Sequence, residues 1–255
     1  MIFDTHCHLN DEQLYPRIDE IISEAEKVGV NKFLVVGWDY NSSLLAIKLA
    51  EKYPQIYAAI GYHPCNVFNV TNQEFDELMS HINDPKVVAV GEIGLDYHWN
   101  KEASEREIQK EFFIKQIEIA NRNNKPITIH NRESFEDCMQ ILKQHKPLFG
   151  GVMHCYSGSV ESVQSVIDLG LLIGFGGTLT FTNAKKPKEV CENTPLDKMV
   201  VETDSPYLSP HPLRGTVNEP KNIALVIDEI TNIKKISKKH IIDVIYETSC
   251  QMFHV

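Results

Sequence analysis

Two histidines, His6 and His8, stand one residue apart at the end of the first apolar segment of the chain, in the stretch DTHCHL. Successive side chains of a strand point to opposite faces, so His6 and His8 would share one face and Cys7 would point to the other. Two imidazoles on one face can bind a single divalent ion, each at about 2.0–2.1 Å. The pair alone fits a structural role equally well. Whether it binds a metal therefore depends on which other ligands the fold places next to it.

Acidic and imidazole side chains also end several later apolar segments. Glu92 lies in the segment VGEIGLD, where burying its charge is costly unless a cation is beside it. Its two carboxylate oxygens would also allow it to bridge two metal ions. A simple ion pair of Glu92 with Arg132 or a lysine is the alternative. The comparable residues at the ends of the other apolar segments are His63, His130, His154, Glu202 and Asp204.

Eight short apolar segments alternate with amphipathic helical stretches along the chain. Their nearly unbroken apolar character indicates strands that are buried on both faces. We expect an α/β fold with one domain, residues 1–255, that forms a TIM-type (β/α)8 barrel. A doubly wound open sheet is the alternative, but no G-x-G-x-x-G motif follows the first strand. The expected strands are residues 2–6, 32–37, 57–63, 87–92, 126–130, 151–154, 171–176 and 199–203.

One of the helical stretches, residues 104–123, has a clear start signal. Ser104 and Glu107 match a capping box, in which the two side chains accept hydrogen bonds from free backbone N–H groups. Apolar residues then recur at helical spacing. We therefore expect this helix to begin at Ser104.

In a (β/α)8 barrel the carboxyl ends of all strands meet at one face, which carries the active site. The barrel would therefore gather these imidazoles and carboxylates around one pocket. We interpret His130 and His154 as ligands of a second metal ion. Asp204 would bind metal and accept a proton from water, and Glu202 would support the site from behind. By alternation Cys155 would face away from the barrel interior.

Other residues near these strand ends fit more than one functional or structural role. His63 in the segment IGYHP fits a substrate contact, a hydrogen-bond donor to a ligand, or a histidine that is simply hydrogen-bonded before Pro64. Tyr97 and Trp99 follow the fourth strand in LDYHWN, where they either pack the loop or stack on a nucleobase. The sequence leaves both choices open.

Composition narrows the class of protein. The chain has 255 residues, 42% of them hydrophobic, and a formal net charge of −10. Such a charge argues against a protein that coats nucleic acid, because that binding depends on neutralising phosphates. The six cysteines are scattered without a C-x-x-C pair, which is typical of reduced thiols. No apolar run approaches the roughly 18 residues of a membrane span, and the start MIFDTH lacks a signal-peptide pattern, so we expect a cytoplasmic protein with no membrane contact.

These motifs together resemble the TatD family of metal-dependent hydrolases, within the amidohydrolase-like barrel enzymes. The matching stretches occur in the family's order and cover nearly the whole chain. They are DTHCHL at 4–9, GYHP at 61–64, GEIGLDY at 91–97, IHNRE at 129–133, HCYSG at 154–158, ETDSPYL at 202–208, RG at 214–215 and NEP at 218–220. In this family a glutamate stands on strand 4 where many amidohydrolase barrels use a modified lysine, and here that residue is Glu92.

The resemblance implies a TIM-type barrel with a two-metal site and deoxyribonuclease activity. By matching position, it assigns one metal to His6, His8, Glu92 and Asp204, and the other to Glu92, His130 and His154. Arg132 resembles the residue that grips a substrate phosphate. Arg214 resembles a further substrate contact, although Thr216 and Val217 follow where many relatives carry a basic residue.

The sequence thus predicts a hydrolase with two divalent ions that cleaves phosphodiester bonds of DNA, near ends or on single strands. Zn, Mn, Co and Ni suit imidazole with carboxylate, and Mg is used by the family. Asp204, Glu92 and Arg132 would be catalytic, and we expect no obligate protein partner. A C–N bond hydrolase on the same metals is the second hypothesis. A barrel that has lost its chemistry and serves as a binding module is the third.

Overall fold

Eight parallel strands form the centre of the computed structural model, which describes residues 1–255. Each strand pairs with the next along the chain, so the sheet order is β1 through β8. This order confirms the predicted barrel and excludes a doubly wound sheet, in which the strand order reverses. The strands are β1 (Ile2–Cys7), β2 (Val30–Val36), β3 (Ile56–Ile60), β4 (Val87–Asp96), β5 (Ile127–Arg132), β6 (Gly151–Met153), β7 (Leu171–Phe175) and β8 (Met199–Val201).

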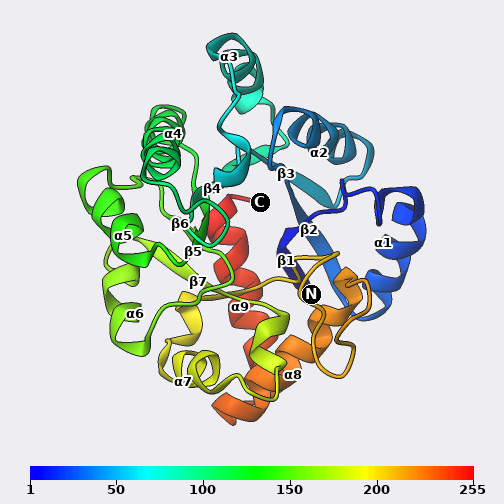
Figure 1. The fold of residues 1–255 in the computed structure, drawn as a ribbon. Helices are drawn as coiled ribbons and strands as arrows, with labels where there is room; N and C mark the ends of the chain where they lie inside the picture. Colours follow the sequence, from blue (N-terminus) through cyan, green and yellow to red (C-terminus); the bar gives the residue numbers. More distant parts are fainter.

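The helices form a ring around the strands, and the last one crosses the centre of the view in Figure 1. None of them is long and apolar enough to pass through a bilayer. They are α1 (Ile18–Lys27), α2 (Tyr40–Lys52), α3 (Asn72–Ser80), α4 (Ala103–Arg122), α5 (Phe135–Gln144), α6 (Val160–Ile167), α7 (Lys185–Asn193), α8 (Ile223–Lys234) and α9 (Lys238–Phe253).

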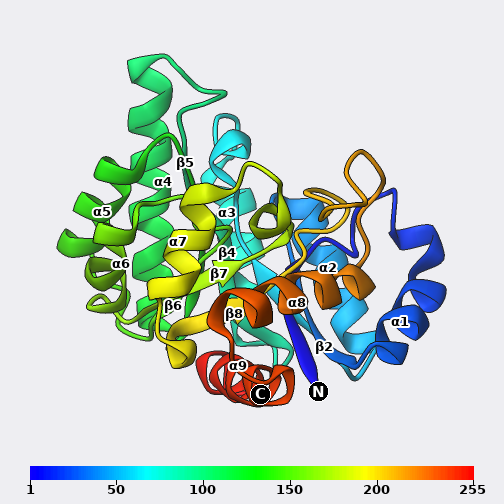
Figure 2. The ribbon, with the colours of Figure 1, turned by 90° about the horizontal axis from the view of Figure 1, so that it is seen from below.

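The interior of the barrel is filled by apolar side chains from seven of the strands and from α9. The ring of Phe253, at the end of α9, packs edge-on against Phe3 of β1 with 5.7 Å between the ring centroids. Figure 2 shows α9 at the same end of the barrel as the N-terminus. The apolar cluster around this contact comprises Phe3, Leu34, Val36, Ala59, Val88, Ala89, Val152, Leu172, Val200 and Phe253. One end of the barrel is therefore closed by packing, which leaves the carboxyl ends of the strands free to form a pocket.

Side chains join β1 to β8, between which no backbone ladder forms. Thr5 Oγ1 donates to Val201 O over 3.0 Å. The buried carboxylate of Asp4 accepts from the backbone N–H of Thr203 at 2.9 Å and from its hydroxyl at 2.6 Å. Beyond the strands, Asp204 N–H donates to His6 O over 2.9 Å. The first and last strands are thus held in register where their functional residues begin.

Several details of the sequence prediction are corrected by the structure. Strands β3 and β8 end at Ile60 and Val201, before the predicted ends at 63 and 203. Strands β4 and β5 continue to Asp96 and Arg132, past the predicted ends at 92 and 130. The predicted capping box is wrong: α4 begins at Ala103, with Glu102 as its N-cap. The carboxylate of Glu105, three residues later, accepts the Glu102 N–H over 3.4 Å. The acidic pair Glu102 and Glu105, two residues upstream of the predicted pair, therefore takes the capping positions.

Replacing Asp4 tests the closure between β1 and β8. Asp4→Ala leaves the Thr203 N–H and hydroxyl without their acceptor, at about 1–3 kcal/mol for each buried group. We expect urea denaturation to show a corresponding loss in the free energy of unfolding. Asp4→Asn retains an acceptor oxygen and should lose much less. An Asp4→Ala protein as stable as Asp4→Asn would contradict this role.

The same variants should also differ in how their free energy of unfolding depends on pH. Burial raises the pKa of Asp4 from 3.8 to about 7. The folded protein therefore holds a proton that the unfolded chain releases, so this group's stabilisation is complete below pH 3.8 and is lost as the pH rises through 7. Asp4→Asn should remove that part of the pH dependence, as measured by unfolding at a series of pH values.

Candidate active site

His6 and His8 at the end of β1 both turn into the barrel mouth, and their proton positions are set by their neighbours. His8 Nδ1 lies 3.0 Å from the carbonyl oxygen of Val36. A carbonyl only accepts, so Nδ1 carries the proton, and in the neutral ring Nε2 presents a lone pair to the pocket. His6 Nδ1 contacts Thr128 Oγ1 at 3.2 Å, and its fully buried Nε2 has no hydrogen-bond partner. Two imidazole nitrogens therefore face the pocket in a form suited to a cation.

Glu92 lies between two groups of histidines, and a bend in β4 puts it there. The register of β4 against β5 shifts between Val90 and Ile93, and the Glu92 N–H donates to Gly37 O beyond β2 over 2.8 Å. Glu92 Oε2 then lies 3.4 Å from His6 Nε2, whereas Oε1 lies 2.8 Å from His130 Nδ1. The two oxygens thus face opposite sides, as the predicted bridging role requires.

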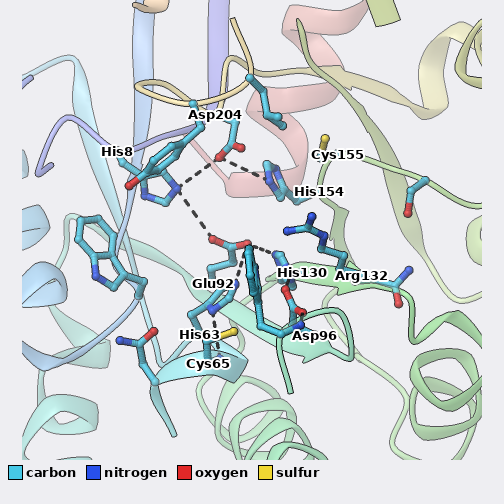
Figure 3. A pocket seen from close by; sticks show the side chains of 17 residues that line it. His8, His63, Cys65, Glu92, Asp96, His130, Arg132, His154, Cys155 and Asp204 are labelled. Atoms are coloured by element: carbon cyan, nitrogen blue, oxygen red, sulfur yellow. Dashed lines mark hydrogen bonds and ion pairs between the residues drawn. The ribbon is translucent and has the colours of Figure 1, made fainter. Parts of the chain in front are cut away.

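Asp204 completes the first group of side chains. Its Oδ1 lies 3.4 Å from His8 Nε2 and 3.9 Å from His6 Nε2. His8 Nε2 is also 3.9 Å from Glu92 Oε2. Figure 3 shows His8, Glu92 and Asp204 turned toward one space. The structure therefore brings together the four residues that the sequence assigned to the first metal.

His154 belongs to the same side of the pocket as this group. Its ring stacks on that of His6, with centroids 3.6 Å apart, and its Nε2 lies 3.6 Å from Asp204 Oδ1. Its Nδ1 lies 3.1 Å from Oε2 of the fully buried Glu202, whose Oε1 accepts the Cys155 N–H at 2.6 Å. Glu202 thus lies directly behind the His154 ring, and its role as a supporting carboxylate stays a prediction.

The second predicted ligand set, Glu92, His130 and His154, is not gathered as closely as the first. His130 contacts Glu92 through Nδ1 and Asp96 through Nε2, at 2.8 and 3.0 Å. Both of its ring nitrogens face carboxylates, and no group of side chains close enough to hold a metal ion contains both His130 and His154. The assignment of this set to a second metal stays a prediction.

Asp96 is a site residue that the sequence reasoning missed. It is 1% exposed, and it lies four residues after Glu92 on the same strand. Even spacing along a strand places two side chains on one face, so this spacing was the available signal. It was lost because the predicted strand ended at residue 92.

The charges of the histidines reflect these carboxylates. Burial would lower the pKa of His130, but its hydrogen bonds to Asp96 and Glu92 outweigh that effect and raise it to about 9. Burial would likewise lower the pKa of His154, but the charges of Glu202 and Asp204 raise it to about 10. The pocket therefore favours positive charge at both places.

His63 differs from the other histidines because its proton faces the pocket. Its Nδ1 accepts the Cys65 N–H over 3.1 Å, so in the neutral ring the proton is on Nε2. That Nε2 lies 3.9 Å from Glu92 Oε1. Burial, together with the charge of His130, lowers the pKa of His63 to about 3, so the ring stays neutral. His63 is thus placed as a donor rather than as a cation ligand.

The two arginines predicted to contact substrate lie in different places. Arg132 lines the pocket of about 740 Å³ that these residues surround. Arg214 does not line it: its guanidinium lies 3.9 Å from the centroid of Phe181 and donates to Ser209 O over 3.4 Å. A contact of Arg214 with substrate stays a prediction, and it requires a substrate that extends beyond the pocket.

The prediction that Cys155 faces away from the interior is wrong in part. Cys155 lines the pocket, because the chain leaves β6 at Met153 and Cys155 adopts a left-handed backbone with φ of 43°. Strand alternation no longer applies at that point. Its nearest polar partner is Thr178 Oγ1, 3.9 Å from Sγ, and it belongs to none of the clusters that could hold a metal ion.

The donor set fits divalent cations. The unpartnered His6 Nε2, the lone pair of His8 Nε2 and the facing oxygens of Glu92 and Asp204 are the nitrogen and oxygen ligands that zinc and similar metals take. Four carboxylates, those of Glu92, Asp96, Glu202 and Asp204, lie in or against the pocket. Burying that much negative charge is costly unless cations balance it.

A barrel with clustered imidazoles and carboxylates at the carboxyl ends of its strands is the arrangement of a metal-dependent hydrolase. The family model described as TatD related DNase matches residues 3–254. The chain therefore belongs to the TatD-related DNase family, as its motifs predicted.

Relatives and solved structures agree with this assignment. The metal-dependent hydrolase YabD of Bacillus subtilis is 42% identical, with the whole of both chains covered. The metal-dependent hydrolase YcfH of Escherichia coli K12 is 33% identical over 100% of this chain and 96% of its own length. The crystal structure of YJJV, a TatD homologue from Escherichia coli K12, superposes with a TM-score of 0.95 at 29% identity, covering 100% of this chain and 98% of that one.

Gly174 on β7 offers a test of the support that Glu202 gives to His154. A Cβ at Gly174 would lie 2.8 Å from both carboxylate oxygens of Glu202 and would displace them. We expect Gly174→Ala to weaken binding of zinc or manganese by about 10–100-fold, the usual effect of losing such support. Competition with a chromogenic chelator measures this.

Gly176→Ala is the matched control. Its Cβ would lie 3.5 Å from Cγ and from the backbone oxygen of Glu202 and 3.9 Å from Oε1, all of which are ordinary contacts. Its metal affinity should equal that of the wild type. Equal affinities for both glycine variants would show that Glu202 does not act on the metal ligands.

Proposed function

We propose that the protein is a metal-dependent phosphodiesterase that cleaves DNA. The observation that carries this proposal is the free guanidinium of Arg132 beside the cluster of ligands. Arg132 is exposed and makes no ion pair, and its neighbour Glu133 pairs instead with His98 at 2.7 Å. A guanidinium grips a phosphate through two parallel hydrogen bonds and offers less to a neutral amide.

We assign the first ion to His6, His8, Glu92 and Asp204, and the second to Glu92, His130 and His154. Two such ions, when bound, make a water molecule nucleophilic near neutral pH and stabilise the phosphoryl oxygens. Ligand histidines must be neutral, so loading requires His130 and His154 to release the protons that the pocket now favours. Metal binding should therefore release protons into solution.

The side chains of the pocket carry out proton transfer, phosphate binding and support of the metal ligands. Asp204 accepts the proton of the attacking water, because its Oδ1 faces the space between His8 and His154. Arg132 holds and orients the phosphate. Glu202 keeps the His154 ring in place, and His63 donates from Nε2 toward the Glu92 side of the pocket. Each group therefore contributes one directed hydrogen bond or one proton transfer.

The proposal is tested with metal-free protein reloaded with Zn, Mn, Co, Ni or Mg in turn. End-labelled single- and double-stranded oligonucleotides serve as substrates. We expect cleavage with at least one metal, and a loss of about 10²–10⁴-fold in Asp204→Asn at equal metal content. If protein with both sites filled cleaves no phosphodiester, the activity lies elsewhere, and hydrolysis of C–N bonds becomes the reading to test.

A pair of arginine variants separates phosphate binding from general charge. Arg132→Lys keeps the charge but cannot form the two-pronged contact, so we expect kcat/KM on an oligonucleotide to fall about 10–100-fold. Metal content, measured by elemental analysis, should not change. Arg214→Lys makes the same chemical change outside the pocket and should have a smaller effect on a short substrate. Equal effects of the two substitutions would remove Arg132 from its proposed role.

A further inference from the structure

Trp99 is the most exposed large aromatic side chain at the mouth of the pocket. It lines the pocket together with Glu92, His130 and Arg132, yet 68% of its surface is exposed. An exposed indole at the rim of a pocket offers a large aromatic surface that a ligand can cover. Tyr97, two residues earlier, is 8% exposed and its hydroxyl donates to Asp137, so it only packs the loop.

The loop that carries Trp99 is fixed to the floor of the pocket. The backbone N–H groups of His98 and Trp99 donate to Oδ1 of the buried Asp96 over 2.9 and 3.0 Å. The other oxygen of Asp96 contacts His130 Nε2. A single carboxylate therefore sets the position of Trp99 relative to the histidine nearest Glu92.

The indole itself is held from two directions. The His98 ring meets it edge-on, with centroids 4.8 Å apart, and His98 is in turn held by Glu133. The guanidinium of Arg132 lies 5.6 Å from the centre of the Trp99 ring. The aromatic surface and the cation that would hold a phosphate are thus neighbours.

We propose that Trp99 forms a nucleobase subsite: a base next to the scissile phosphate stacks on the indole while Arg132 binds the phosphate. This inference rests on the proposed phosphodiesterase function and adds the part of the substrate that is recognised. Stacking on an aromatic ring accepts any base, because every base has a π-face. The subsite therefore gives affinity without sequence preference.

The subsite also selects the form of the nucleic acid. A base can lie on Trp99 only if it has left its neighbours in the duplex, which is easiest in single strands and at frayed ends. The protein has a net charge of −10, so it gains little from contacts along a phosphate backbone. Stacking supplies local affinity that does not depend on a basic track.

The test compares Trp99 variants on substrates with and without the base. Short single-stranded oligonucleotides carry either all their bases or an abasic residue at each position flanking the cleaved bond in turn. On the complete substrate, Trp99→Ala should lower kcat/KM about 5- to 150-fold, mainly through KM, and Trp99→Phe should recover most of it. On the abasic substrate at the critical position, wild type and Trp99→Ala should be cleaved equally.

Leu148→Ala is the matched control, since Leu148 is also 68% exposed and lies away from the catalytic pocket. It should match the wild type on every substrate, and all variants should bind equal amounts of metal. A Trp99→Ala loss of the same size on complete and abasic substrates, or no loss at all, overturns the subsite.

A binding measurement separates this inference from the proposed activity. Trp99 is one of only two tryptophans, so in Trp38→Phe it alone reports by fluorescence. Because Trp38 also lines the pocket, with its ring 5.2 Å from that of His8, cleavage is measured in the wild type. A single-stranded oligonucleotide should quench it, and the abasic version should not. Quenching without any cleavage retains the subsite and overturns the phosphodiesterase function. Cleavage without quenching, and without an effect of Trp99→Ala, retains the phosphodiesterase function and overturns the subsite.

Discussion

The cost of burying negative charge governs the carboxyl-terminal end of this barrel. Glu92, Asp96 and Glu202 are each at most 5% exposed, and Asp204 lies beside them. Carboxylates removed from water require positive partners or hydrogen-bond donors. In the chain itself this requirement is met by imidazoles, and it raises the pKa values of His130 and His154. A divalent cation meets the same requirement more completely, so the electrostatics that shape the pocket also make it a metal site.

Five histidines share this environment, yet their hydrogen bonds give them different chemistry. The Val36 carbonyl lies beside His8 Nδ1 and the Glu202 carboxylate lies beside His154 Nδ1, so in the neutral rings the protons stay on Nδ1 and the other nitrogens become acceptors. A backbone N–H holds the His63 ring the opposite way and turns its outer nitrogen into a donor. The partners behind the rings therefore decide which histidines can bind a metal. Displacing one of these partners, as Gly174→Ala would displace Glu202, would act on the site without removing any ligand.

The proposed function would concentrate recognition of the substrate at the rim of the same pocket. A chain with a net charge of −10 repels a long polyanion, so its affinity must come from a few local contacts. Arg132 supplies charge without a competing carboxylate, and Trp99 supplies an aromatic surface next to it. Asp96 links this rim to the floor, because it holds both the Trp99 backbone and the His130 ring. Positioning of the phosphate and of its flanking base would thus be coupled to the metal ligands through one residue.

The sequence by itself determined the fold class and the residues gathered at the strand ends. Alternation along β1 turned His6 and His8 inward, and eight apolar segments placed Glu92, His154 and Asp204 at one face. Local periodicity suffices for such statements, because it fixes which face of a strand a side chain occupies. Only the tertiary structure could decide which groups meet. It placed Asp96 against His130, left Arg132 free while Arg214 turned to Phe181, and exposed Trp99 while it buried Tyr97. Those outcomes depend on bends, loops and contacts between distant segments, for which the order of residues along one strand carries no signal.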